Sequence, residues 1–286
     1  MIMKRNIIYP LLYTLILIVS CAEKEYADEK PLHTSGGSAT VMDKEENVIR
    51  LVQYNVGAFR KSGGSSLTMI ADMMKELNAD VVSLNEVDSC TTRTSKINQI
   101  ASFSYAMGGW NGYFAKAMDH MGGAYGVAVS SSANLAPLKT YSVKLPQGDD
   151  SEPRAMAVVE FSDFIFASTH LGLTDSSQMQ QLNTINNWFA TKYPSTSKPI
   201  FLCGDFNNTP SSELIAEVKK TWKNASTTGA YTMPSNNPRK VIDYIFVRSA
   251  DQAVRIVKTA VPKQFNSGTV ATASDHLPVY VDIKLL

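Results

Sequence analysis

The chain has 286 residues, of which 44% are hydrophobic and 19% are charged, a balance typical of a folded globular protein and not of a disordered chain. Its formal net charge is only +1, whereas a dedicated duplex-DNA binder usually carries a basic excess or a basic stripe. The length favours one large domain over two small ones.

The N-terminus has the pattern of an export signal. Two basic residues precede an apolar run at 7–19, which is shorter than the roughly 20 residues of a typical membrane-spanning helix and fits the hydrophobic region of a secretory signal. The run ends in LIVSC, which resembles the lipidation box of bacterial lipoproteins, although Val19 is bulkier than the residue usual there. We therefore expect residues 1–20 to be a lipoprotein signal peptide and Cys21 to be lipidated; a signal anchor and plain secretion are the alternatives. On this prediction the protein is exported and held in the bacterial cell envelope, and it contacts the membrane through that anchor only.

A polar, irregular stretch follows this cysteine. Residues 21–47 are rich in charges, glycine and serine, which predicts a flexible tether, and residues 48–286 then form the folded domain. Two further cysteines remain, Cys90 and Cys203, and a single pair is no disulfide framework for a domain of this size. Cys203 lies in an apolar run, so we expect a small core residue there; a Cys90–Cys203 bridge is the alternative.

The domain alternates between strand and helix patterns. Residues 48–56 and 79–84 have strand patterns, and between them Leu67, Ile70 and Leu77 recur at helical spacing. Further strands are predicted at 126–130, 138–145, 154–161, 164–170, 199–205, 240–247, 253–261 and 276–285, and further helices at about 175–190 and 209–222. These mixed connections predict two sheets packed face to face with helices outside. The segments 105–123 and 223–240 are predicted to be loops, and their glycines, five in the first and one in the second, predict that they are mobile.

Polar residues end or open six of these strands. They are Asn55, Asn85 with Glu86, His170, Asp205 with Asn207, Asp243, and Ser274 to His276. Any one of them has an ordinary explanation, since Asn and Asp commonly end strands and most strand-end histidines are structural. Six together favour a hydrolytic site, because a hard cation such as Mg²⁺ takes oxygen ligands, a carboxylate takes a proton from water, and an imidazole donates to a phosphate oxygen.

The motifs, in this order, resemble those of a known family. Asn55, Glu86, His170, GDFN at 204–207, IDYIF at 242–246 and SDHLP at 274–278 together resemble the endonuclease/exonuclease/phosphatase superfamily, which includes deoxyribonuclease-I-like nucleases, sphingomyelinases and inositol-phosphate phosphatases. The resemblance runs from about residue 48 to the C-terminus. It implies an α+β fold, a four-layer αββα sandwich with two mixed, mostly antiparallel sheets. It also implies divalent-metal-dependent hydrolysis of phosphate mono- or diesters by in-line attack of an activated water.

The same resemblance implies a metal site. Glu86 is the implied main ligand, with Asn55 and Asp275 in the shell of the same ion, one tightly bound Mg²⁺ or Mn²⁺. Two departures from the family pattern matter here. Asn85 stands where many members have Gln, and Gly57 stands where some have an Asp that would supply a further ligand. The glycine favours a single ion.

The resemblance also implies the catalytic residues. They orient and deprotonate the water, contact the phosphate and hold one histidine in place: Asp205, Asn207, His170, His276 and, hydrogen-bonded to His276, Asp243. Arg154 resembles an arginine that begins the equivalent strand in other members. It either binds the phosphate of the substrate or forms an ordinary surface ion pair.

The motifs specify the phosphate and not the group attached to it. We expect a secreted, lipid-anchored, monomeric phosphoesterase. A nuclease of the same fold that cleaves DNA or RNA is one alternative, and a surface binding protein that has lost activity is another. Trp110, Tyr113 and Tyr231, in the two predicted loops, are candidates either to stack on a base or sugar or to pack in the interior.

Overall fold

The computed structural model describes residues 43–286, except 62, 151, 227–229 and 250–252. The predicted signal peptide, the predicted lipidation site Cys21 and most of the predicted tether lie outside the described residues. Within the part that is described, no helix is both long enough and apolar enough to cross a membrane.

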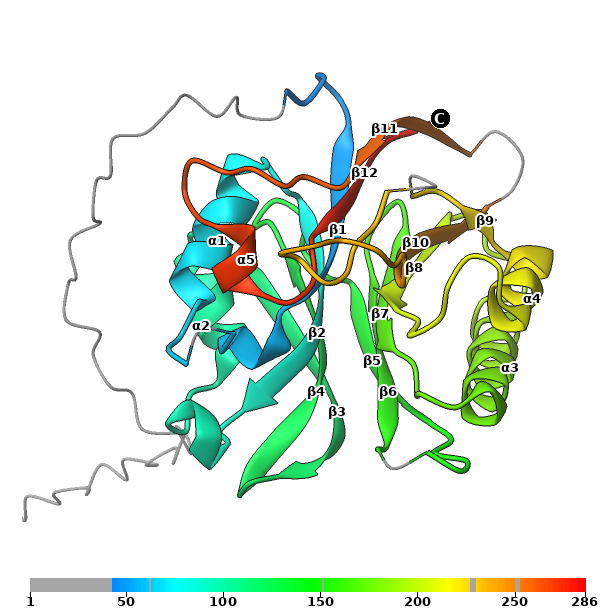
Figure 1. Ribbon diagram of the computed structural model, residues 1–286. Coiled ribbons are helices and arrows are strands. Elements are labelled where there is room, and N and C mark those ends of the chain that lie inside the picture. Colours follow the sequence, from blue (N-terminus) through cyan, green and yellow to red (C-terminus); the bar gives the residue numbers. More distant parts are fainter. Residues whose placement is uncertain (1–42, 62, 151, 227–229, 250–252) are drawn as a thin grey trace, which may run out of the picture.

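Twelve strands in this part of the chain form two six-stranded sheets that pack face to face (Figure 1). The first sheet has the order β11 (Val254–Ala260), β12 (Val279–Leu285), β1 (Ile49–Asn55), β2 (Val81–Ser89), β4 (Gly123–Ser131), β3 (Asn111–His120). The second has the order β5 (Lys139–Leu145), β6 (Arg154–Glu160), β7 (Ile165–His170), β8 (Ile200–Asp205), β10 (Asp243–Arg248), β9 (Lys223–Asn224).

Each sheet is antiparallel apart from one parallel pair. β1 and β2 run parallel, as do β7 and β8, and each pair is joined by a crossover helix, α1 (Leu67–Glu76) or α3 (Asp175–Lys192). Figure 1 shows α1, α2 (Gln99–Ala106) and α5 (Val270–Ala273) outside the first sheet, and α3 and α4 (Glu213–Thr221) outside the second. Short 3-10 turns at Gly57–Phe59 and Thr92–Thr94 complete the described elements. The prediction of a four-layer αββα sandwich is confirmed.

Apolar side chains fill three layers, one between the sheets and one under each group of helices. Leu51 and Ile283 face the second sheet, whereas the next residue along β1, Val52, packs toward the helices, as the two-residue period of a strand requires. Cys203 is a free thiol in the layer between the sheets. It is therefore the core residue that the sequence predicts, and no bridge joins it to Cys90.

The segment 105–123 is not the mobile loop that its glycines predict. It contains the end of α2 and the strand β3, which pairs with β4 from Asn111 to His120. β3 lies at the edge of its sheet, and most of its residues are half-buried or exposed. An edge strand has little need for an apolar face, so the alternation by which a strand is recognised is weak here. The other predicted loop, 223–240, contains only the short β9 in its described part.

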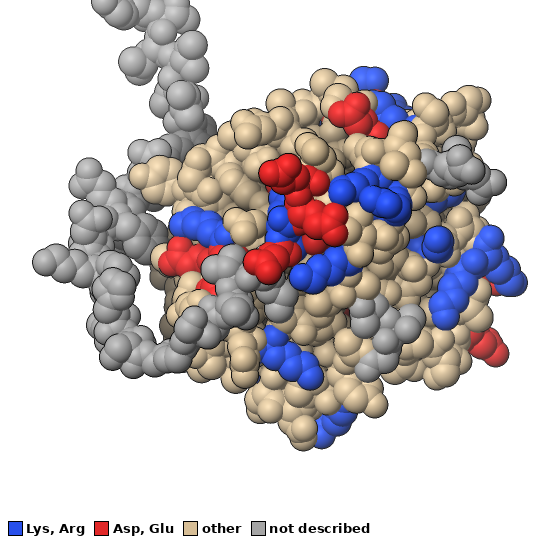
Figure 2. All heavy atoms as spheres, turned by 90° about the horizontal axis from the view of Figure 1, so that it is seen from above, with Lys and Arg blue, Asp and Glu red and all other residues tan. Residues whose placement is uncertain are grey.

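The outer surface carries charges of both signs. Figure 2 looks onto the molecule from the side where β1 begins, and acidic and basic side chains are interspersed there on a largely uncharged surface. Two ion pairs involve the residues just before β1: Lys44 pairs with Asp80, and Glu45 pairs with Lys284. The described residues on this face therefore form no single-sign stripe of the kind that a duplex-DNA binder uses.

Candidate active site

Three strands of the second sheet place polar residues in one row. His170 ends β7, Asp205 ends β8 and Asp243 begins β10, and the register pairs the first with the second and the second with the third. Residues paired in this way point to the same face of a sheet. Phe201 and Cys203 lie four and two residues before Asp205 and therefore on the same face of β8. Both are in the layer between the sheets, so this face is turned toward the first sheet. The packed strands thus fix three titratable side chains at the gap between the sheets.

The first sheet supplies the opposing residues. Asn55 ends β1 and pairs with Asn85 of β2. β2 is then irregular between Leu84 and Val87, and Glu86 has a φ of 57°. This left-handed conformation costs a residue other than glycine roughly 1–2 kcal/mol, and such strain is found where the direction of a side chain matters. The sequence predicts a strand end at Glu86, but β2 bulges there and continues.

Asn55 connects the two sheets. Its Nδ2 donates to Oε1 of Glu86 and to Oδ2 of Asp205, at 3.0 Å each, while its Oδ1 accepts from the backbone N of Gly57 at 3.1 Å. The carboxylates of Glu86 and Asp205 therefore lie on either side of one buried amide. Residues far apart in the sequence converge as the motifs require.

Asn85 and Gln53 form a second connection between the two sheets. Oδ1 of Asn85 accepts from the backbone N of Asp205 at 3.0 Å and from Nε2 of Gln53 at 2.5 Å. The same Nε2 lies 3.3 Å from Oδ1 of Asp243. Asn85, which stands where many family members have Gln, therefore helps to position the two aspartates. Gln53 is a site residue that the motifs do not include, although its place two residues before Asn55, on the same face of the strand, is a signal in the sequence.

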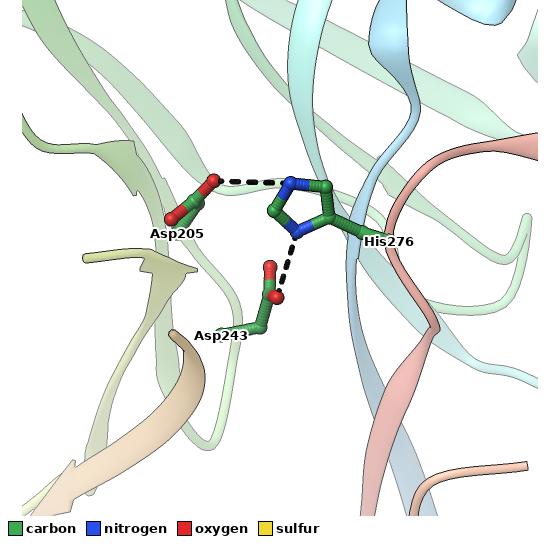
Figure 3. Close-up of side chains that lie close together, drawn as sticks. All are labelled: Asp205, Asp243 and His276. Carbon is green, nitrogen blue, oxygen red and sulfur yellow. Dashed lines mark hydrogen bonds and ion pairs between the residues drawn. The ribbon is translucent and has the colours of Figure 1, made fainter. Parts of the chain in front are cut away.

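His276 lies between two carboxylates (Figure 3). Its Nδ1 donates to Oδ2 of Asp243 at 2.8 Å, and its Nε2 is 3.6 Å from Oδ2 of Asp205. Burial alone would lower the pKa of His276, but the neighbouring carboxylates, above all Asp243, raise it to about 10. The imidazole is therefore a cation at neutral pH, and the proton on Nε2 is available to an acceptor in the site.

Asp205 is a base whose pKa lies near neutrality. Burial, followed by the charge of Asp243, raises the pKa of Asp205 to about 7, although His276 acts in the opposite direction. Its Oδ1 accepts from the backbone N of Asn207 at 2.8 Å, while Oδ2 faces Asn55 and the two histidines. A base with a pKa near the working pH is ionised often enough to act and still takes up a proton readily.

The second histidine, His170, is neutral. Burial and the positive charges of Arg154 and His276 hold the pKa of His170 well below its ordinary value. Nη1 of Arg154 is 3.3 Å from Nδ1 of the ring, and Nδ2 of Asn207 is 3.0 Å from Nε2. Both neighbours are donors, because a guanidinium cannot accept and the same Nδ2 donates to O of Leu171 at 3.0 Å. A neutral imidazole has a single acceptor nitrogen, so this part of the site has one donor too many.

Arg154 adds to the excess of donors. Its side chain is 4% exposed, and its Nε has no hydrogen-bond partner among the described residues. Oε2 of Glu152, 3.3 Å from Nη1, is the carboxylate oxygen that faces the guanidinium. Buried donors without acceptors are rare and costly. An anion with several acceptor oxygens would satisfy the unpaired donors of Arg154 and its neighbours.

A divalent cation fits best at Glu86. Burial, and then the charge of Asp275, raises the pKa of the Glu86 carboxyl, against the opposing hydrogen bond from Asn55. Carboxylate oxygens that lack a cationic partner are ligands suited to Mg²⁺ or Mn²⁺. Gly57 brings no ligand, and a Cβ added there would lie 3.4 Å from Oδ1 of Asp275. Asn55, an expected ligand, holds Glu86 and Asp205 through its nitrogen in this structure.

A second group also has a spacing compatible with a metal ion. Asp205, Asp243 and His276 are buried, and one potential ligand atom from each lies within 4.8 Å of the others. However, Nδ1 of His276 already donates to Asp243, and a metal ion at that nitrogen would have to replace the proton. This group is therefore a hydrogen-bonded unit in this structure, which leaves Glu86 as the residue better suited to a cation.

Comparisons with known proteins agree with this geometry. No curated protein matches the chain. Solved structures match its fold: an endonuclease/exonuclease/phosphatase from Bacteroides vulgatus has 19% identity and a TM-score of 0.69, and covers 84% of this chain and 100% of its own. A mannosyl-6-phosphatase from Bacteroides thetaiotaomicron has 17% identity and a TM-score of 0.67, over 82% and 99% of the two chains. TDP2 from D. rerio, solved with a single-strand DNA product, has 16% identity and a TM-score of 0.64, over 84% and 100%.

At these identities the solved structures show the fold alone, and the family itself is shown by the sequence. The sequence model of the Endonuclease/Exonuclease/phosphatase family matches residues 52–276. This range begins in β1 and ends at His276, so it contains every residue of the candidate site. The chain belongs to the endonuclease/exonuclease/phosphatase family.

Proposed function

We propose that the protein is a divalent-metal-dependent phosphoric ester hydrolase that cleaves phosphate mono- or diesters by in-line attack of water. The observation that carries the proposal is the excess of buried donors around His170 and Arg154, beside the cationic His276. Nothing among the described residues accepts from Nε of Arg154. A phosphoryl group would bring acceptor oxygens to this position.

The phosphate contacts follow from the donors. His276 would donate from Nε2 to one phosphoryl oxygen, and Asp243 would keep that ring charged and correctly turned. Arg154 would donate to a second phosphoryl oxygen, which would supply an acceptor for a guanidinium that has too few around His170. Asn207 would hold the phosphate or the water from the loop after β8. Charge that develops on the oxygens during attack would be stabilised by groups already in place.

Asp205 would activate the water. Its Oδ2 faces the gap between the sheets, and its pKa of about 7 suits a group that takes a proton from water near neutral pH. Asn55 and the backbone N of Asn207 hold its two oxygens in position, so the base does not have to reorganise before it acts. The alcohol would leave on the side of the phosphorus opposite this water.

Glu86 and Asp275 would hold one Mg²⁺ or Mn²⁺, with Asn55 orienting Glu86. When bound, such an ion neutralises charge on the phosphate and on the leaving oxygen. The raised pKa of the half-buried Glu86 carboxyl supports this assignment, since a carboxylate that forms no ion pair among the described residues gains most from a cation. Gly57 leaves no side chain for a second ion on that side, which supports a single tightly bound ion.

The test is a panel of phosphate mono- and diesters assayed with Mg²⁺, with Mn²⁺ and with EDTA. We expect metal-dependent hydrolysis in the wild type, abolished by EDTA and reduced by about 10²-fold or more in His276→Ala and Asp205→Asn. Asp163→Asn, a change at an exposed aspartate, is the matched control and should leave the rate unchanged. Turnover that persists in EDTA, or that is insensitive to both active-site changes, would refute the proposal.

Nuclease activity is the second candidate function, and the panel should therefore include supercoiled DNA and RNA. A relative of this fold was solved with a single-strand DNA product, and another is a mannosyl-6-phosphatase, so the fold accepts both kinds of substrate. The near-neutral charge favours a small ester over a polyanion. A surface binding protein without activity would hydrolyse nothing in the panel, and Asp205→Asn would then change nothing.

We also propose that the enzyme is exported, works as a monomer and is anchored by a lipid on Cys21. The support is the apolar run at 7–19 and the LIVSC box. Metabolic labelling with a fatty acid should mark the wild type and not Cys21→Ala. Label that survives this change would contradict the lipid anchor and leave the catalytic proposal untouched.

A further inference from the structure

The second sheet has a distal end, opposite the candidate site. Its outermost row of paired residues is Lys139, Glu160, Ile165, Ile200 and Arg248, one from each of five neighbouring strands. The site residues end β7 and β8 and begin β10, so they lie at the other end of the same strands. The row is about 19 Å wide, since neighbouring strands are about 4.8 Å apart, and Figure 2 looks onto this end of the molecule.

Exposed lysines gather at the distal end. Lys192 ends α3, Lys219 lies in the last turn of α4, and Lys223 begins β9 beside the end of β10. All three are exposed, and none of them forms an ion pair among the described residues. Asp163, exposed in the turn between β6 and β7, is the acidic residue at this end that also forms none. The unpaired charge of the distal end is therefore mainly positive.

The other carboxylates near this end are already matched by lysines. Glu160 lies 2.9 Å from Nζ of Lys198 and 3.8 Å from Nζ of Lys139, so one carboxylate faces two cations. Glu217 pairs with Lys220 on the surface of α4. These ion pairs leave the positive charge of the unpaired lysines uncompensated.

Arg248 adds a cation that is held flat. Its guanidinium carbon lies 5.0 Å from the centroid of the Trp222 ring and 5.7 Å from that of Phe189, and both rings are buried. The arginine itself is half-buried and has no acceptor among the described residues. A guanidinium stacked on aromatic rings keeps its N–H donors at its edges, and this fork binds two oxygens of a phosphate.

An exposed apolar side chain lies at the same end. Leu138 directly precedes the edge strand β5, where its backbone N donates to O of Glu160 at 2.8 Å, and it is 60% exposed. Cations around an exposed apolar residue suit a lipid surface, because the cations attract anionic head groups and the apolar group is buried among them. A nucleic acid would use the cations and leave the leucine in water.

The chain enters the domain at this end of the sandwich. The carbonyl oxygen of Asp43, the first described residue, lies 3.0 Å from Nη2 of Arg50 and 3.4 Å from Nζ of Lys258. β1 begins close by at Ile49 and runs from there toward the site (Figure 1). The proposed lipid on Cys21 is thus joined to the end remote from the site, through residues 21–42, which reach at most about 75 Å when fully extended.

We propose that the basic distal end of the second sheet, with its exposed leucine, docks on an anionic phospholipid surface. The domain then stands on the membrane with its site turned away from it. Its substrates are therefore esters that arrive from the aqueous phase and not the head groups of the bilayer beneath it. This inference rests on the proposed lipid anchor, which brings the distal end to the membrane, and not on the proposed hydrolytic activity.

The first test is co-sedimentation of the mature chain, carrying Cys21→Ser, with vesicles of phosphatidylcholine alone or with about 30% phosphatidylglycerol. We expect binding to the anionic vesicles only, weakened by added salt. The double variant Lys219→Glu, Lys223→Glu should lower this affinity by about 10- to 100-fold. Lys61→Glu, Lys240→Glu makes the same change of charge at exposed positions of the site end, and as the matched control it should lower the affinity by less than about threefold.

The second test determines the orientation of the lipidated protein in the same vesicles by hydrogen exchange. Amides of residues 193–198 and 219–224, at the distal end, should exchange more slowly on anionic than on neutral vesicles. Amides of residues 57–61 and 231–240, beside the site, should exchange equally on both. Slower exchange beside the site would mean that the site faces the bilayer, which contradicts the inference.

The binding assay can also overturn the inference while the proposed function stands. Absent binding, or equal binding to neutral and anionic vesicles, would do so, as would equal losses in the two double variants. Salt-sensitive binding of single-stranded DNA or RNA by a chain that does not bind vesicles would assign the distal end to nucleic acid instead. Neither test measures turnover, so failure of the proposed function is detected separately, in the panel of phosphate esters.

Discussion

Asp243→Asn tests whether the positive charge on His276 matters for the reaction. In the wild type, Oδ2 of Asp243 accepts from Nδ1 of His276 at 2.8 Å in a buried pair, and the pKa of His276 is raised to about 10. The amide of an asparagine would fit the same space and donate to Nδ1. Nε2 would then keep its proton, but the ring would be neutral at pH 8. The variant therefore removes the charge and retains the donor.

The expected loss follows from that charge. Unit charges about 4 Å apart interact by roughly 4 kcal/mol at an effective dielectric of 20, which corresponds to a rate factor of about 10³ if it is fully expressed in the transition state. We therefore expect kcat/KM at pH 8 to fall by about 10²- to 10³-fold. As the pH falls through the lowered pKa of His276, the ring regains its proton and the loss should shrink to about tenfold or less near pH 5.5.

The assay is the ratio of wild-type to variant kcat/KM from pH 5.5 to 9. Asp205 titrates in both proteins. The variant removes the charge of Asp243, which raises the pKa of Asp205, and at high pH also the charge of His276, which lowers it, so the two effects on Asp205 oppose each other in the ratio. His276→Ala is the control, because without an imidazole its loss relative to the wild type should not vary with pH in this way. A ratio for Asp243→Asn that is the same at every pH would show that the charge on His276 plays no part in the reaction.

The same pair also affects stability. Because the pKa of His276 in the folded protein lies above its ordinary value, its contribution to stability is fully present below about pH 6.5 and is lost as pH rises through about 10. Breaking a buried pair of this kind costs up to about 3–5 kcal/mol. The difference in free energy of unfolding between the wild type and Asp243→Asn should therefore be largest near pH 6 and become small near pH 10, as measured by urea denaturation.

Four further changes probe the metal site, the phosphate site and the backbone. Glu86→Gln should raise the melting temperature in EDTA by a few degrees, because it removes a half-buried carboxylate whose pKa is raised, and it should abolish any stabilisation by Mg²⁺; a variant stabilised by Mg²⁺ as much as the wild type would exclude Glu86 as the ligand. Mg²⁺ affinity of the wild type, measured by calorimetry, should fall as pH is lowered, since the ion competes with the proton on Glu86, whose pKa is raised; a constant affinity would contradict this. Arg154→Met should weaken inhibition by inorganic phosphate by about 10- to 100-fold, and unchanged inhibition would return Arg154 to the role of an ion-pair residue. Gly57→Ala should lower the free energy of unfolding by roughly 1–2 kcal/mol because φ is 53° there, and an unchanged value would mean that the turn relaxes at no cost.

The parts of the fold that could be predicted are those with a strong local pattern. Strands such as β7 and β8 are buried along their whole length because both faces are covered, and each begins with an apolar run against which the polar residues at its end stand out. The motif at Asp205 was recognisable for this reason. β3 was missed because an edge strand needs no buried face, and its residues 111–120 carry no such background.

The local geometry of the site could not be predicted in the same way. Nothing in the sequence signals the bulge at Glu86, since an acidic residue in a left-handed conformation is held there by the tertiary structure and not by its own preference. The partners of Asn85 are also invisible in the sequence, because it accepts from Gln53 on the neighbouring strand and from Asp205 in the opposite sheet. Each of these contacts exists only after the two sheets have packed.

The proposed phosphate site is built on strand ends from both sheets, which the amides of Asn55 and Asn85 join across the gap. A change in any one member therefore disturbs its neighbours in the opposite sheet. Because the motifs specify these strand ends and not the surfaces around them, they identify the family and leave the substrate to be found by experiment.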